Sequence, residues 1–299
     1  MVTILSHHEK GNETSQFRQK TEGISSKPIR LAFSFFFLAL FFRVVDIFVL
    51  EMNTTDFGIL PSKVFPILFI LLYLRHREKR VSSIGIHSDD WQRNVFLAVL
   101  AILVFNGILY CGGYLVLFII NIQPQIIFYK LDYIAFDLVY QTANAFMEEM
   151  LFRGLMLVCF MTVMRPLKAN LLQGLLFGLW HIVWPINSYL GGLISAGAAI
   201  GWATEYFFSS MIVGLLWGYM FQRTRSLLSP ILLHFFINFI SAYVFIEPSV
   251  SLIKLVLGLV GFLLTFVTVF VFTKKEMRYN KSNTLNEEVS GPPSLDTKR

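Results

Sequence analysis

Charged side chains are scarce in this sequence. They make up 15% of its 299 residues, whereas 55% of the residues are hydrophobic and the mean hydropathy is +0.62. A soluble domain has about 25% charged residues. Apolar segments occupy most of the chain from Leu31 to Phe272, which leaves no room for a soluble domain of normal size. The composition therefore indicates an integral membrane protein.

Cysteine is scarce, and the N-terminal sequence predicts no cleavable leader segment. The two cysteines, Cys111 and Cys159, lie inside apolar segments, so they predict small core residues and no disulfide framework. The first thirty residues contain no apolar core, which argues against a cleavable signal peptide, and the last residues form no prenylation motif. We expect a polar cytoplasmic segment at 1–30, a transmembrane domain at 31–272 and a disordered cytoplasmic tail at 273–299.

The apolar runs predict an all-α, polytopic transmembrane helical bundle. We expect about eight spans, near residues 31–50, 60–74, 95–120, 134–164, 170–187, 205–221, 228–246 and 252–272. Lysine and arginine gather at both termini and in alternate loops, which by the positive-inside rule makes both termini cytoplasmic in a multi-pass cell-membrane protein. This placement also explains the net charge of +6. We therefore expect the lipid bilayer as a partner and no nucleic acid.

The segment 191–204 (GGLISAGAAIGWAT) could be read as a ninth span. A ninth span would put Arg223 and Arg225 outside, and the segment is short and rich in glycine. We predict a re-entrant or outer loop here. No internal repeat is visible, which weakens a transporter interpretation.

Ionisable residues inside a bilayer need a partner or a function. Arg43 and Asp46 are three apart in the first span, so we expect them to pair with each other. In the fourth span, Arg153 follows Glu149 by four residues and can close an ion pair within one helix. Glu148 points about 100° away from Glu149 and shares a face with Asn144.

Two histidines, His181 and His234, lie in later spans, and Asn238 follows His234 by one helical turn. Counted from the cytoplasmic helix ends at about 1.5 Å per residue, Glu148 is roughly 24 Å deep and His234 roughly 9 Å deep. Both values fall within a bilayer core of about 30 Å, so these helices can converge. One carboxylate, two imidazoles and a carboxamide can activate water and stabilise an oxyanion.

Three motifs in order resemble a known family. Glu148-Glu149-Met-Leu-Phe-Arg153 matches EExxxR, Phe177-Gly-Leu-Trp-His181 matches FxxxH, and His234-Phe-Phe-Ile-Asn238 matches HxxxN. Together they look like the CPBP family of CAAX proteases and bacteriocin-processing enzymes, also called the Abi family. The resemblance covers roughly 134–246, which would be the catalytic half.

The resemblance implies an intramembrane glutamic endopeptidase with no metal or other cofactor, in a bacterial plasma membrane. Glu148 and His181 would activate water, and His234 and Asn238 would stabilise the oxyanion. Glu149, Arg153, Phe177 and Asn144 would support the site. The substrate would be a membrane-associated peptide or protein: a prenylated CAAX peptide, a bacteriocin leader, a signal-peptide remnant or a receptor precursor.

Other functions remain open. Glutamate and histidine also bind zinc, so a metal-dependent membrane hydrolase is one alternative, although no HExxH motif occurs. A non-catalytic immunity or scaffold protein is another, although such a protein gains nothing from buried charge. The absence of GxSxG and GxGD argues against serine and aspartyl intramembrane proteases.

Overall fold

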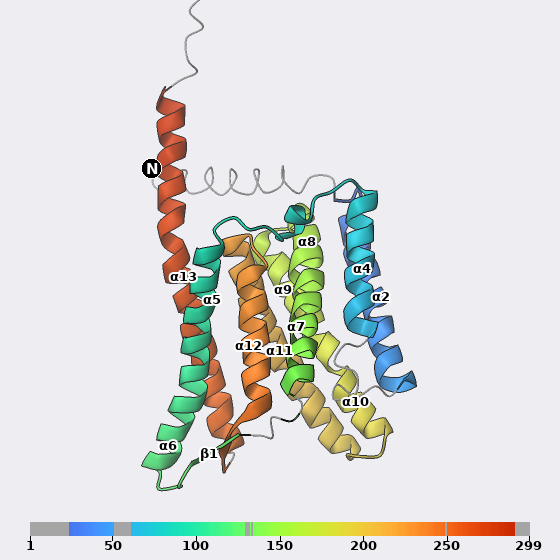
Figure 1. Ribbon diagram of the computed structural model, residues 1–299, viewed down its shortest axis with the longest axis vertical. Helices are drawn as coiled ribbons and strands as arrows, with labels where there is room; N and C mark the ends of the chain where they lie inside the picture. The colour runs from blue at the N-terminus through green and yellow to red at the C-terminus, as the bar shows by residue number, and fades with distance from the viewer. Residues whose placement is uncertain (1–23, 51–60, 129–131, 133, 249, 291–299) are drawn as a thin grey trace, which may run out of the picture.

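Helices dominate the computed structural model, which describes residues 24–50, 61–128, 132, 134–248 and 250–290 (Figure 1). Residues 1–23 of the expected N-terminal segment lie outside the described residues. The α-helices are α2 (Pro28–Val44), α4 (Pro61–His76), α5 (Trp91–Asn106), α6 (Gly113–Ile119), α7 (Ile134–Glu149), α8 (Val158–Val163), α9 (Pro166–His181), α10 (Val183–Leu190), α11 (Ala196–Thr224), α12 (Leu228–Tyr243) and α13 (Ser251–Ser290). Three π-helical segments, η1 (Val45–Val49), η3 (Gly107–Gly112) and η5 (Met150–Leu157), extend α2, join α5 to α6 and join α7 to α8.

Five helical segments are long and apolar enough to cross a membrane: Pro28–Val49, Trp91–Ile119, Pro166–Leu190, Ala196–Thr224 and Leu252–Lys274. The shorter α12 is also apolar, and α4 and α7–η5–α8 match two further predicted spans. Large apolar side chains such as Leu103 on α5 and Leu263 on α13 are exposed, which suits a lipid environment. The predicted all-α polytopic bundle is confirmed, and the chain is a membrane protein.

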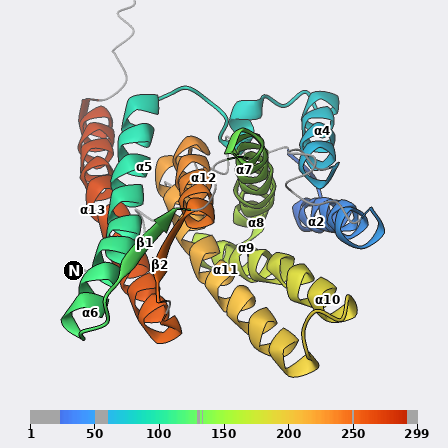
Figure 2. The same cartoon turned by 60° about the horizontal axis from the view of Figure 1, so that its bottom comes forward.

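The structure differs from the predicted loop at 191–204. Only residues 191–195 form a turn, and Ala196 begins the long helix α11, whose N-cap Ser195 accepts a hydrogen bond from the Ala198 amide. The loop prediction was wrong because residues 196–204, most of which are small, form the first turns of α11, which packs against α9 and α10. Helices α10 and α11 form a hairpin that projects at one end of the bundle (Figure 2).

Two further segments differ from expectation. Helix α13 continues to Ser290, through most of the predicted disordered tail, where the sequence between Thr273 and Gly291 contains no Pro or Gly. A short antiparallel ribbon joins β1 (Gln125–Phe128) to β2 (Val244–Glu247), where we expected the end of the seventh span. Residues 291–299 of the tail lie outside the described residues.

The core lies around η5, whose eight residues are all buried. Helices α2, α4, α9 and α11 contact it. Helices α9 and α11 approach closely because their seam is lined by glycines; a Cβ on Gly178 would lie 2.6 Å from the Phe207 carbonyl oxygen. The segment that follows the glutamate pair is thus enclosed on several sides, which fixes the position of the pair.

Candidate active site

The glutamate pair ends α7 where the π-helical segment η5 begins. Arg153 Nη1 donates to Glu149 Oε1 at 2.9 Å, and both side chains are fully buried. Arg153 also donates to the Gly214 carbonyl oxygen through Nη2 at 3.2 Å. The ion pair predicted between Glu149 and Arg153 is confirmed, and it ties the end of α7 to α11.

The Glu149 carboxylate also holds His234, a contact that the sequence did not predict. His234 Nδ1 lies 2.9 Å from Glu149 Oε1, and the Trp217 ring stacks on the imidazole at 4.1 Å between centroids. A carboxylate only accepts hydrogen bonds, so it favours a proton on Nδ1. The Nε2 atom of His234 therefore points away from Glu149.

The Glu148 carboxylate turns one oxygen toward both histidines. Its Oε2 lies 4.0 Å from His181 Nε2 and 3.9 Å from His234 Nε2. His181 Nδ1 is 2.8 Å from the Phe177 carbonyl oxygen, which also can only accept, so Nδ1 carries the proton and Nε2 offers a lone pair in the neutral ring. Three atoms that can exchange protons thus converge from α7, α9 and α12.

The other oxygen of Glu148 has three donors. Trp180 Nε1 donates to Oε1 at 3.0 Å, Lys63 Nζ at 3.4 Å and Arg43 Nη1 at 3.5 Å. The prediction that Arg43 pairs with Asp46 was wrong. Asp46 Oδ2 instead accepts the Ser62 amide at 2.7 Å at the start of α4, where backbone N–H groups lack helical partners.

A cavity of about 590 Å³ opens beside these groups. Glu148, His181, His234 and Asn238 all line it, as do Asn144 and Phe177. Asn238 Nδ2 donates to Gln141 Oε1 at 3.3 Å, and the Phe177 ring packs against His181 at 4.7 Å between centroids. The four residues predicted to be catalytic therefore face one space, whereas Glu149 and Arg153 lie behind it.

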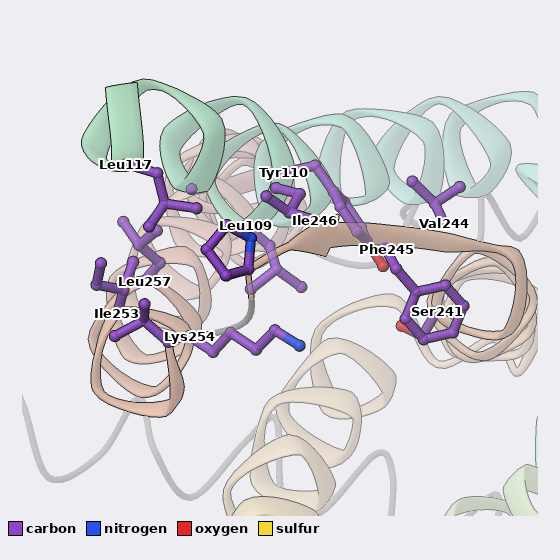
Figure 3. A pocket seen from close by; sticks show the side chains of 13 residues that line it. Leu109, Tyr110, Leu117, Ser241, Val244, Phe245, Ile246, Ile253, Lys254 and Leu257 are labelled. Atoms are coloured by element: carbon purple, nitrogen blue, oxygen red, sulfur yellow. The ribbon is translucent and has the colours of Figure 1, made fainter. Parts of the chain in front are cut away.

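A second cavity, of about 220 Å³, is lined mainly by apolar side chains of η3, α6, β2 and α13, with Lys254 at its edge (Figure 3). It contains none of the predicted site residues. Within the described part of the chain, no group of three or more His, Cys, Asp or Glu side chains is arranged to hold a metal ion.

Sequence reasoning missed four side chains that contact the site. Arg43 drew attention as a charge within a span, but Asp46 offered a nearer partner along the helix. Lys63 gave no signal, because it stands at the edge of an apolar run where a snorkelling lysine is ordinary. Trp180 and Trp217 look like core aromatics in sequence. Only the tertiary arrangement brings these side chains to Glu148 and His234.

Comparison with known proteins supports the resemblance stated above. The sequence model of the family described as "Type II CAAX prenyl endopeptidase Rce1-like" matches residues 130–240, which include all three motifs and exclude Arg43 and Lys63. No curated protein and no solved structure matches the chain. The similarity to the CPBP family of CAAX proteases is thereby confirmed over residues 130–240.

Proposed function

We propose that this chain is an intramembrane glutamic endopeptidase in which Glu148 activates the water that attacks a peptide bond. The observation that carries the proposal is the convergence of Glu148 Oε2 with the Nε2 atoms of His181 and His234 at 3.9–4.0 Å. These separations exceed a direct hydrogen bond and suit groups that share a water molecule. The adjoining cavity leaves room for a peptide.

The first step is a proton transfer. Glu148 Oε2 and the His181 Nε2 lone pair orient a water molecule between them, and Glu148 takes its proton as the O–C bond forms at the scissile carbonyl carbon. Oε1 already has three donors, so Oε2 is the oxygen available as the base.

The second step needs a stabilised oxyanion and a protonated leaving group. Asn238 Nδ2 and a protonated His234 Nε2 donate to the developing oxyanion, while Glu149 balances the imidazolium charge through Nδ1. The proton held by Glu148 passes to the amide nitrogen as the C–N bond breaks. The products are a carboxylic acid and an amine; the acid then gives its remaining proton to the amine, which leaves a carboxylate and an ammonium group, and Glu148 is ionised again.

The charges around Glu148 favour a mechanism without a metal ion. Arg43 and Lys63 lie within 3.5 Å of Oε1, and two cations at that distance repel a divalent ion. We expect activity to survive a strong chelator such as EDTA or 1,10-phenanthroline. Loss of activity that zinc restores would favour the metal-dependent alternative.

The decisive variant is Glu148→Gln, which keeps the size of the side chain and removes the base. We expect cleavage to fall by at least about 100-fold, the lower end of what general-base catalysis contributes. Glu205→Gln is the matched control, because Glu205 is an exposed acid on α11 that does not line the cavity. Full activity of Glu148→Gln would rule out the mechanism. An unchanged cellular phenotype in that variant would favour a scaffold.

The substrate class and the cellular membrane belong to the same proposal. We propose a membrane-associated substrate in a bacterial plasma membrane, with both termini cytoplasmic. A prenylated CAAX peptide, a bacteriocin leader, a signal-peptide remnant and a receptor precursor are the candidate substrates. Comparing membrane peptides from cells that carry the native chain with those that carry Glu148→Gln would distinguish them, since only the substrate accumulates uncleaved.

A further inference from the structure

We propose that Lys63 and Arg43, from the first two helices, are positioning residues that hold Glu148 Oε1 and so aim Oε2 at the attacking water. This inference rests on the proposed function of Glu148. It extends the catalytic unit beyond residues 130–240, because α2 and α4 lie outside the matched segment. The two cations and Trp180 are called the Oε1 clamp below.

The residues of the Oε1 clamp are buried inside the protein and do not form a surface contact. Lys63 is 1% exposed and Arg43 is 4% exposed. The Arg43 guanidinium lies over the Trp180 ring at 4.5 Å from its centroid, while the Trp180 N–H donates to Glu148. Three helices thus supply three donors to one oxygen atom.

The position of Lys63 argues against a role in helix stability. Lys63 lies in the first turn of α4, where the helix dipole disfavours a cation. That helix end already has an acidic partner, because Asp46 accepts the Ser62 amide. A buried ammonium is unfavourable in itself, so Lys63 needs an anion, and the structure places Glu148 at 3.4 Å.

The clamp has a chemical consequence. A carboxylate can rotate and present either oxygen, and a base that is misplaced by about 1 Å can lose about 100-fold in rate. Donors on Oε1 fix the plane of the carboxylate, so that Oε2 faces both histidines. Lys63 does not line the cavity, whereas Arg43 does. Lys63 therefore affects the base without touching the substrate.

The test is Lys63→Met, which keeps the length of the side chain and removes the charge. We expect kcat to fall about 100-fold with KM within twofold of the native value. For Arg43, we expect Arg43→Met to lose kcat and Arg43→Lys to recover a large part of it. Lys254→Met is the control, since Lys254 is an exposed lysine on α13 at the edge of the other cavity.

A thermal-unfolding cycle covers the case in which Lys63→Met folds poorly. If Lys63 is present because of Glu148, Glu148→Gln should lower the Tm, and the double variant Glu148→Gln/Lys63→Met should regain much of it. Independent, additive losses in Tm would overturn the clamp.

Failure of the clamp and failure of the proposed function give different results. If Glu148→Gln is inactive but Lys63→Met keeps kcat within twofold, the clamp is wrong and the base assignment stands. If Glu148→Gln is fully active, the proposed function itself is wrong.

Discussion

Glu149 uses one carboxylate oxygen for two partners. Its Oε1 lies 2.9 Å from Arg153 Nη1 and 2.9 Å from His234 Nδ1. The same atom therefore neutralises a buried cation and orients an imidazole. The role in stability and the proposed role in catalysis can be separated by experiment.

We predict that Glu149→Leu lowers the free energy of unfolding by about 3–5 kcal/mol, because it leaves the Arg153 charge buried and unpaired. Adding Arg153→Met should restore much of the stability, since no buried charge then lacks a partner. The kcat of the double variant should stay below the native value, because His234 Nδ1 has lost its acceptor. Thermal unfolding in detergent and kcat, measured on the native chain and on these two variants, check this. Native kcat in the double variant would show that Glu149 does not orient His234.

At the scale of single residues, local spacing predicted what lies within one helix. The four-residue spacing of Glu149 and Arg153 gave their ion pair, because i,i+4 residues share a helix face. The same reasoning failed for Arg43, since a partner 105 residues away competed with Asp46. The contacts of Lys63 and Trp180 with Glu148 depend on how helices pack, and sequence spacing carries no information on that.

At the scale of elements, the eight predicted spans all correspond to helical segments, but depth along a helix was not predictable. His234 is only six residues beyond the start of α12, yet it meets Glu148. Counting residues from the helix ends placed His234 shallower than Glu148, whereas the two side chains lie 3.9 Å apart in the structure.

The glycine seam between α9 and α11 gives a prediction at the element scale. Gly178→Ala would put a Cβ 2.6 Å from the Phe207 carbonyl oxygen, a backbone atom that cannot rotate away. We expect a loss of about 1–3 kcal/mol in unfolding free energy, typical of overpacking, and reduced activity because α9 carries His181. Gly258→Ala on α13 is the matched control, since its Cβ would meet nothing within 4 Å. Equal Tm values for the two variants, measured in detergent, would contradict the close packing of this seam.

At the scale of the whole molecule, basic side chains gather at one end of the bundle. They lie where α4 and α8 end, where α5 and α9 begin and where α11 ends (Figure 1): Arg75, Arg77, Lys79, Arg80, Arg93, Arg165, Lys168, Arg223 and Arg225. The turn between α10 and α11 lies toward the opposite end. By the positive-inside rule we expect the basic end to be cytoplasmic and the α10–α11 turn to face outward.

This orientation predicts which added cysteines a membrane-impermeant maleimide reaches in intact cells. In a background with Cys111→Ser and Cys159→Ser, Leu193→Cys should be labelled, because Leu193 is 78% exposed in the α10–α11 turn. Ser82→Cys, exposed between α4 and α5 at the basic end, should be labelled only after the cells are permeabilised. Labelling of Ser82→Cys alone in intact cells would invert the topology. Since the α10–α11 hairpin borders the Glu148 cavity through Trp184, Trp202 and Tyr206, the result also decides from which side of the membrane a substrate reaches Glu148.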